Sequence, residues 1–481
     1  MLENAEKILA ERFGHRALLS EQVPVVERVL GGGDALVVWP TGAGKSLCFQ
    51  LPALVKAGAN EERGVTLVFS PLIALMEDQV AALKKKGIAA EYINSSLGKR
   101  EREKRYAALA AGKYNLIYAT PERMAVPGFR EAIESVPGGV NLLAVDEAHC
   151  ISKWGHDLRP AYSEVGAFRR DLGCPTTVAL TATATRAVRR DIRAVLGLDE
   201  EAMPLFAQPV ARENLALSVA EVWDEADKIR EIAAVATEMP GTGIVYTALI
   251  KDLDRYADLL RRALPDRRVM IYHGRLDPRE KKAIYKCFID AKPSDNLLLV
   301  ATNAFGMGVD KPDLRFIVHA QLPGSVEAYA QEVGRAGRDG LASKCVLLYA
   351  EDDLAIQQEF VEWQNPGADI LGHVAEAMAH NYGPGMHADF DVDEIRRAAF
   401  GIGHAKVGAR VEYALITFEK MGIVERTGID GRYRMVRSLI DGEIDETQLA
   451  EKRTRDLMRL LEMVRLTKAG DVAAFVTDYF D

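Results

Sequence analysis

Two adjacent carboxylates, Asp146 and Glu147, follow the apolar run LLAV and could together carry out metal-assisted chemistry. Such a run is typical of a buried parallel strand, whose carboxyl end is where open α/β sheets bind ligands. A Mg²⁺-nucleotide site needs one carboxylate to hold the metal and a second to polarise the attacking water. The alternative is a pair of acids that caps a surface strand. A phosphate-binding segment elsewhere in the chain favours the first interpretation.

That segment is WPTGAGKS, which follows the apolar run ALVV and ends at Ser46. Gly42 and Gly44 allow backbone N–H groups to face phosphate oxygens at the start of a helix. Lys45 would then place a charge on the terminal phosphates, and Ser46 a hydroxyl on Mg²⁺. The pattern GxxxxGK[ST] is not fully met, because Trp39 stands at its first glycine. The alternative is a chance glycine-rich turn with a solvated lysine.

Composition limits the class of protein. The 481 residues, 48% of them hydrophobic and 27% charged, predict about three ordinary domains. No apolar run approaches the ~18 residues that span a bilayer, and the N-terminus does not read as a signal peptide, so a cytoplasmic location is expected, at the nucleoid if the source is bacterial. The five cysteines form no CxxC pair and suit free thiols. A net charge of −9 indicates that any nucleic-acid contact is a local groove.

Apolar runs alternate with amphipathic stretches from Asp34 to about Leu205, and the alternation then starts again. The later strands are expected at 243–247, 268–274, 296–302 and 314–320, after a polar connector at 208–214. The fold class is therefore α/β, with two doubly wound parallel-sheet lobes. The expected domains are 1–207, 208–350 and a mostly helical region at 351–481. Because the second lobe has no phosphate loop, the nucleotide is expected between the lobes.

The segment QEVGRAGRDG of the second lobe offers the missing positive charge. Arg335 and Arg338 are three residues apart, so on a helix they would share a face and reach the γ-phosphate. A guanidinium suits this task because it is a rigid, permanently charged fork. The alternative is an exposed basic helix with surface ion pairs.

These segments, taken in order, resemble those of RecQ-type superfamily 2 DNA helicases over about 13–349. The matching runs are FGHRALLSEQ, WPTGAGKSLCFQLPA, FSPLIALMEDQV, YATPERM, VDEAHCISKWGHDLRPAY, ALTATAT, VATNAFGMGVDKPDLRF and QEVGRAGRDG. The resemblance implies two RecA-like lobes that close on Mg²⁺-ATP and move along single-stranded DNA from 3′ to 5′.

The resemblance also implies roles for individual residues. Nucleotide binding falls to Gln22, Thr41, Gly42, Gly44, Lys45, Ser46 and Asp310, with Mg²⁺ held through ATP by Ser46 and Asp146. Catalysis falls to Lys45, Asp146, Glu147, His149, Arg335 and Arg338, with Thr181 and Thr183 relaying the state of the γ-phosphate. DNA contacts fall to Ser70, Thr120, Trp154, His156, Arg159 and Thr302. Leu158 and Lys153 depart from the family's phenylalanine and glutamine, which leaves Trp154 as the main stacking surface.

The C-terminal region is expected to contain a winged-helix-like module. An amphipathic helix at 405–422 is followed by IVER, a GIDG turn and RYRMVR, which read as a two-stranded wing. Four arginines would charge this wing: Arg426, Arg432, Arg434 and Arg437, with Arg432 and Arg434 taken as DNA contacts. The alternative is an α+β packing module with a solvated basic hairpin.

No structural zinc is expected, because the four cysteines of the family's zinc-binding subdomain are absent. Either apolar packing replaces the zinc, through residues such as Leu457, Leu460, Leu461, Val464 and Phe475, or the chain stops before part of that module.

The expected function is therefore that of an ATP-dependent DNA helicase in DNA repair or recombination. Its expected partner is single-stranded and tailed or branched duplex DNA, and no association with a membrane is expected. One alternative is an RNA helicase or duplex translocase with the same motor. Another is a DNA-binding scaffold for which ATP is only a conformational ligand.

Trp154 provides the first test of DNA sensing. Trp154→Ala should keep basal ATP hydrolysis but lose most of its stimulation by single-stranded DNA, because base stacking on the indole would be the signal of bound DNA. The measurement is ATP turnover with and without single-stranded DNA. A collapsed melting transition in the variant would instead favour Trp154 as a core anchor.

Overall fold

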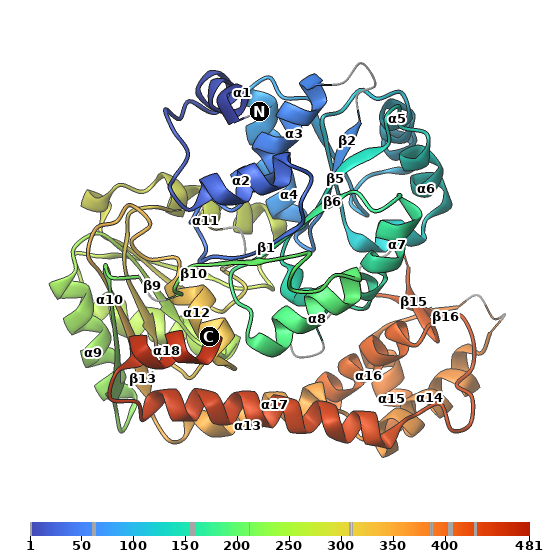
Figure 1. Ribbon diagram of the computed structural model, residues 1–481. Coiled ribbons are helices and arrows are strands. Elements are labelled where there is room, and N and C mark those ends of the chain that lie inside the picture. Colours follow the sequence, from blue (N-terminus) through green and yellow to red (C-terminus); the bar gives the residue numbers. More distant parts are fainter. Residues whose placement is uncertain are drawn as a thin grey trace. The chain divides into compact units, whose positions relative to one another are not determined.

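The computed structural model describes residues 2–59, 64–152, 159–210, 212–306, 309, 311–384, 386, 388–402, 407–427 and 431–481. The chain divides into two compact units (Figure 1). The first unit holds residues 1–321, 326–348 and 469–481, and the second holds residues 322–325 and 349–468.

The first unit contains a seven-stranded sheet in the order β3-β4-β2-β5-β6-β1-β7. Its strands are β1 (Ala35–Val38), β2 (Val65–Phe69), β3 (Ala90–Ile93), β4 (Leu116–Ala119), β5 (Val140–Val145), β6 (Thr176–Thr181) and β7 (Leu205–Ala207). Its helices are α1 (Leu2–Ile8), α2 (Gln22–Leu30), α3 (Leu47–Ala59), α4 (Ile73–Lys85), α5 (Lys99–Ala110), α6 (Pro127–Glu134), α7 (Val165–Asp171) and α8 (Arg186–Leu196). Four short helices complete it: η1 (Leu9–Phe13), η2 (Pro121–Ala125), η3 (Ala148–Ile151) and η4 (Pro160–Glu164).

A second, six-stranded sheet of the same unit has the order β10-β11-β9-β12-β13-β8. Its strands are β8 (Leu215–Glu221), β9 (Thr242–Tyr246), β10 (Arg268–Tyr272), β11 (Leu297–Ala301), β12 (Leu314–His319) and β13 (Ser343–Tyr349). Its helices are α9 (Glu225–Glu238), α10 (Ile250–Ala263), α11 (Pro278–Asp290), η5 (Pro293–Asp295), α12 (Val326–Val333) and α18 (Val472–Phe480). The four strands expected from the sequence are β9 to β12, and β8 and β13 were not predicted.

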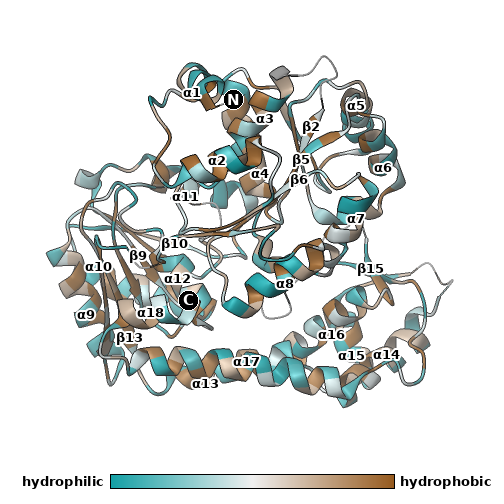
Figure 2. Ribbon diagram, viewed as in Figure 1, coloured by the Kyte–Doolittle hydropathy of each residue, from teal (hydrophilic) through white to brown (hydrophobic). Residues whose placement is uncertain are grey.

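The strands of the first sheet are largely apolar because both faces of the sheet are covered. Leu36 and Val38 of β1 belong to one hydrophobic core, whereas Ala35 and Val37 belong to the other. Figure 2 shows hydrophobic residues along the strands and mixed character along the covering helices, such as α8. The neighbouring strands pair in parallel, as β1 does with β6. The predicted α/β class with two doubly wound parallel sheets is confirmed.

The second unit is mostly helical and has its own core. Its elements are α13 (Asp353–Gln364), α14 (Ala368–Tyr382), β14 (Asp389–Phe390), α15 (Val392–Phe400), α16 (Gly408–Lys420), β15 (Val424–Arg426), β16 (Tyr433–Met435) and α17 (Glu446–Thr467). The strands form an antiparallel sheet in the order β14-β16-β15. Buried side chains of α14, α15 and α16 pack on it, among them Val374, Ile395 and Leu415. The predicted helix and the two paired strands of the predicted hairpin are present, whereas residues 428–430 of its GIDG turn lie outside the described residues. β14 is an additional strand.

The predicted packing of α17 was wrong in part. Leu457 and Leu461 are each 41% exposed, whereas Leu460, Met463 and Leu466 are buried. Residues spaced by three or four lie on one helical face, and the buried face of α17 follows the spacing of 460, 463 and 466. Val464 and Phe475 are half-buried.

Among the described residues, no group of three or more His, Cys, Asp and Glu side chains is arranged to hold a metal ion. The lack of structural zinc stays a prediction. None of the helices in the described part of the chain combines the length and apolar character needed to cross a bilayer.

Candidate nucleotide site

Strand order brings the phosphate loop and the two acids to one edge of the first sheet. β6 pairs in parallel with β1 on one side and with β5 on the other. The loop that begins at Trp39 follows β1, the acids follow β5, and Thr181 ends β6. The Trp39 N–H donates to the Thr181 carbonyl at 3.2 Å, and the Asp146 N–H donates to the Phe69 carbonyl at 2.8 Å. The carboxyl edge therefore carries the candidate site.

The phosphate loop adopts the backbone that its glycines permit. Gly42 and Gly44 have φ angles of 87° and 76°, which L side chains rarely adopt. The Lys45 ammonium donates to the carbonyls of Trp39 at 2.8 Å and Pro40 at 3.1 Å. Burial lowers the pKa of Lys45, and the carboxylates of the two acids act in the opposite direction. The lysine side chain is therefore held over the loop by these two carbonyls.

Two side chains from neighbouring helices contact this loop. The Gln22 amide accepts from the Leu19 N–H at 3.0 Å and donates to the Gly44 carbonyl at 3.2 Å. The Gln79 amide of α4 donates to Ser46 Oγ at 3.4 Å. Gln79 was not predicted, although it lies in the quoted run FSPLIALMEDQV. Thr41 is half-buried in the turn before Gly42.

The acidic pair is held in an unusual backbone. Glu147 has a φ of 49° and a ψ of 46°, a left-handed conformation that costs a non-glycine residue on the order of 1 kcal/mol. Its N–H donates to Asp146 Oδ1 at 3.0 Å, and the buried Tyr162 hydroxyl donates to the Asp146 carbonyl at 2.9 Å. Burial, followed by the neighbouring Glu147, raises the pKa of Asp146 to about 7. A divalent cation beside the two carboxylates would favour their ionised forms and so offset the rise in the pKa of Asp146. The two carboxylates therefore fit Mg²⁺.

A chain of polar contacts leads from Glu147 towards the second sheet. His149 Nδ1 lies 3.3 Å from Glu147 Oε2 and 2.9 Å from Thr181 Oγ1. The Thr183 N–H donates to Thr181 Oγ1 at 3.3 Å. The Gln331 amide of α12 then donates to Thr183 Oγ1 at 3.4 Å. The residues predicted to relay the state of the γ-phosphate therefore contact one another.

Arg335 and Arg338 do not lie on a helix, so the predicted shared helix face was wrong. α12 ends at Val333, and the following residues form turns in which Gly337 takes a φ of 56°. Arg335 is 6% exposed, and its guanidinium lies beside Gly306. Arg338 extends to the phosphate loop, where a Cβ on Gly42 would lie 2.9 Å from Arg338 Cδ. Of the two arginines, Arg338 is the one whose side chain reaches the phosphate loop, and its action on a nucleotide stays a prediction.

The expected DNA-contact residues of the two sheets lie at strand ends. Ser70, Thr120 and Thr302 follow β2, β4 and β11, and all three are buried. Ser70 Oγ has no hydrogen-bond partner among the residues that the structure describes. Arg159 donates to the Pro71 carbonyl at 3.2 Å and so lies against the same loop. Three predicted residues lie outside the described part of the chain: Trp154, His156 and Asp310.

The arginines of the predicted wing are all engaged with carboxylates of the second unit. Arg432 lies 3.6 Å from Glu394, and Arg434 lies 2.7 Å from Asp389. Arg426 pairs with Glu419, and Arg437 pairs with Glu443. A DNA phosphate would have to compete with these carboxylates, so the positive charge of the wing is partly cancelled. The role of Arg432 and Arg434 in DNA binding stays a prediction.

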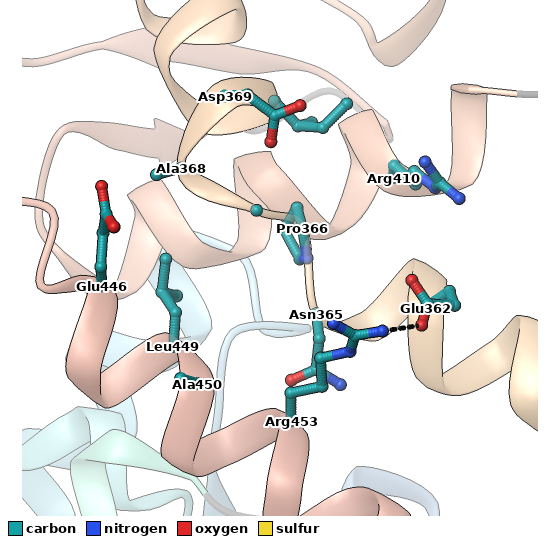
Figure 3. Close-up of a pocket in the computed structure, with 12 residues that line it drawn as sticks. Glu362, Asn365, Pro366, Ala368, Asp369, Arg410, Glu446, Leu449, Ala450 and Arg453 are labelled. Carbon is teal, nitrogen blue, oxygen red and sulfur yellow. Dashed lines mark hydrogen bonds and ion pairs between the residues drawn. The ribbon is translucent and has the colours of Figure 1, made fainter.

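The second unit also contains a cavity of about 340 Å³ (Figure 3). Its walls come from α13, α14, α16 and α17, and Arg453 pairs across it with Glu362 at 2.5 Å. Arg410 is the other cation, whereas Asp369 and Glu446 add further acids. This mixed charge does not match a polyphosphate, and none of the predicted site residues that the structure describes lines the cavity.

The chain matches two protein families, one over the region of the first sheet and one over the region of the second. Residues 20–191 match the DEAD/DEAH box helicase family, and residues 225–340 match the helicase conserved C-terminal domain. The chain is 37% identical over 374 residues to a probable ATP-dependent DNA helicase RecS of Bacillus subtilis, covering 78% of this chain and 72% of that protein. The chain belongs to the RecQ-type family of ATP-dependent DNA helicases.

Other members of the RecQ-type family are longer. The chain is 41% identical over 365 residues to ATP-dependent DNA helicase RecQ of Bacillus subtilis, covering 75% of this chain and 59% of that protein. Among solved structures, the DUF1998 helicase MrfA bound to DNA has a TM-score of 0.61 at 20% identity, covering 92% of this chain and 63% of that one. At that identity the likeness concerns the fold alone.

Two substitutions separate nucleotide binding from chemistry at this site. Lys45→Ala should weaken ATP binding and abolish hydrolysis, because it removes the cation over the phosphate loop. Glu147→Gln should bind ATP but not hydrolyse it, because it removes the base and keeps Asp146. The measurements are ATP affinity and turnover of both variants. Turnover of Glu147→Gln close to wild type would show that Glu147 is not the base.

Proposed function

We propose that this chain is an ATP-driven helicase that moves along single-stranded DNA from 3′ to 5′ and unwinds duplexes. The observation that carries the proposal is the position of Arg338, from the turns between α12 and β13, over the phosphate loop that follows β1. A site that is complete only when two sheets meet can couple hydrolysis to their relative movement. The names of the RecS and RecQ relatives support DNA as the substrate.

The residues present suit Mg²⁺-ATP. Gln22 would contact the base, while Thr41, Gly42 and Gly44 would turn backbone groups to the phosphates. Ser46 and Asp146 would hold Mg²⁺ together with the nucleotide. When bound, the metal would neutralise charge on the β- and γ-phosphates.

Hydrolysis would follow from the geometry of Glu147 and Arg338. Glu147 would accept the proton of the attacking water, and its contact with His149 would hold the carboxylate in place. Arg338 would stabilise the negative charge that develops on the transferred phosphoryl group. Loss of the γ-phosphate would remove the phosphate contact of Arg338. The hydrogen bonds that link His149 to Gln331 would couple the loss of the γ-phosphate to the position of α12.

DNA would bind along the strand ends that carry Ser70, Thr120 and Thr302. Backbone N–H groups and hydroxyls at strand ends bind phosphates without reading the sequence, which suits a translocating motor. Arg159 lies against the loop after Ser70. Trp154 would supply base stacking.

We also propose that the second unit is a winged helix that contacts duplex DNA. The order helix, strand, two helices and two strands, from α14 to β16, supports this assignment, as does the sheet order β14-β16-β15. α16 would then be the recognition helix and β15–β16 the wing. We also propose a role in DNA repair or recombination, where branched or tailed DNA occurs, and a cytoplasmic location.

An unwinding assay tests the function directly. The chain should unwind a duplex with a 3′ single-stranded tail, but neither a blunt duplex nor a 5′-tailed one, and only with hydrolysable ATP. Glu147→Gln is the control, because it should bind the same DNA without unwinding it. Unwinding of tailed RNA in preference to DNA would assign an RNA helicase. DNA binding with ATP hydrolysis absent from the wild type would assign an ATP-switched scaffold.

A further inference from the structure

The connector between the two sheets contacts both parts of the candidate site. Gln208 follows β7, and its N–H donates to the carbonyl of Val38 at 3.0 Å, one residue before the phosphate loop. Arg212 and Asn214, at the other end of the connector, contact the loop that carries Arg338. The sequence predicted only a polar connector here.

Arg212 holds the arginine-bearing loop through three backbone carbonyls. Its guanidinium donates to Gly334 at 3.0 Å, to Gly337 at 3.2 Å and to Ala336. These three residues lie between or next to Arg335 and Arg338. Burial lowers the pKa of Arg212, and the charge of Arg338 lowers it further, so this cation approaches another cation while it binds the carbonyls. A guanidinium is the side chain whose several fixed donors suit such a cluster of acceptors.

Asn214 holds the same loop from a second direction. Its Nδ2 donates to the Gly337 carbonyl at 2.8 Å and to the Leu341 carbonyl at 2.9 Å. A Cβ on Gly337 would lie only 2.5 Å from that nitrogen, so the glycine and the amide fit each other. Five hydrogen bonds from two side chains thus fix the turn on both sides of Arg338.

We propose that Arg212 and Asn214 are positioning residues that set the place of Arg338 over the phosphate loop. Neither residue acts on the nucleotide itself. Through these two residues, the connector would align Arg338 with the phosphates. The connector is also hydrogen-bonded to β1 through Gln208. The inference rests on the proposed ATP hydrolysis.

The test compares Arg212→Ala with a matched control, Arg267→Ala. Arg267 is also half-buried and also donates to three carbonyls, those of Gly241, Ala236 and Met239, but these lie at the end of α9. Arg212→Ala should lower kcat for ATP hydrolysis by a factor on the order of 10², because a misplacement of about 1 Å has that effect. Its ATP affinity should stay within a few-fold of wild type. Arg267→Ala should change melting temperature but not kcat.

Asn214→Ala keeps the test decisive if Arg212→Ala fails to fold, because it removes fewer hydrogen bonds and should lower kcat in the same direction. A double variant tests whether Arg212 affects kcat through Arg338. If Arg212 acts through Arg338, Arg212→Ala should have little further effect on kcat in an Arg338→Ala background.

The outcomes separate this inference from the proposed function. A wild-type chain without ATPase activity would contradict the proposed function. An active wild type would overturn the inference if Arg212→Ala and Asn214→Ala keep full kcat, if they lose ATP affinity instead, or if Arg267→Ala lowers kcat equally. Effects of Arg212→Ala and Arg338→Ala that simply add would also overturn it.

Discussion

Arg338 lies over Gly42 of the phosphate loop, and the rest of the candidate site depends on this contact. The first sheet brings Lys45, Asp146 and Glu147 to one edge, but it offers a triphosphate a single lysine beside two acids. A phosphoryl group in transfer needs further positive charge, which a guanidinium supplies well. Under the proposed function, Arg338 would provide it from the second sheet's side, so movement of one sheet against the other would change the chemistry as well as the shape.

The parts of the site that could be predicted from the sequence are those that one short segment contains. WPTGAGKS holds its glycines, lysine and serine together, and the acids Asp146 and Glu147 directly follow their strand. Parallel strands end at a common edge, so two such segments could be expected to meet. The alternation of apolar runs with amphipathic stretches predicted both doubly wound sheets, because strands that are buried on two faces are largely apolar.

The rest depends on contacts that the sequence does not show. Arg212 and Asn214 bond backbone carbonyls about 120 residues away, and a carbonyl has no signature in a sequence. Arg335 and Arg338 have helical spacing, but α12 ends at Val333, before both of them. Gly337, which lies between them, takes a left-handed conformation. Leu457 and Leu461 looked like core residues, yet α17 buries the face that holds Leu460 and Met463. β14 has two residues, too few for a recognisable alternation.

The most direct test measures ATP turnover and ATP affinity of Arg338→Ala in the presence of single-stranded DNA. If Arg338 stabilises charge in the transition state, kcat should fall by a factor on the order of 10³ while ATP affinity changes little. A variant that keeps its kcat but loses nucleotide binding would contradict this, because Arg338 would then hold the ground state only.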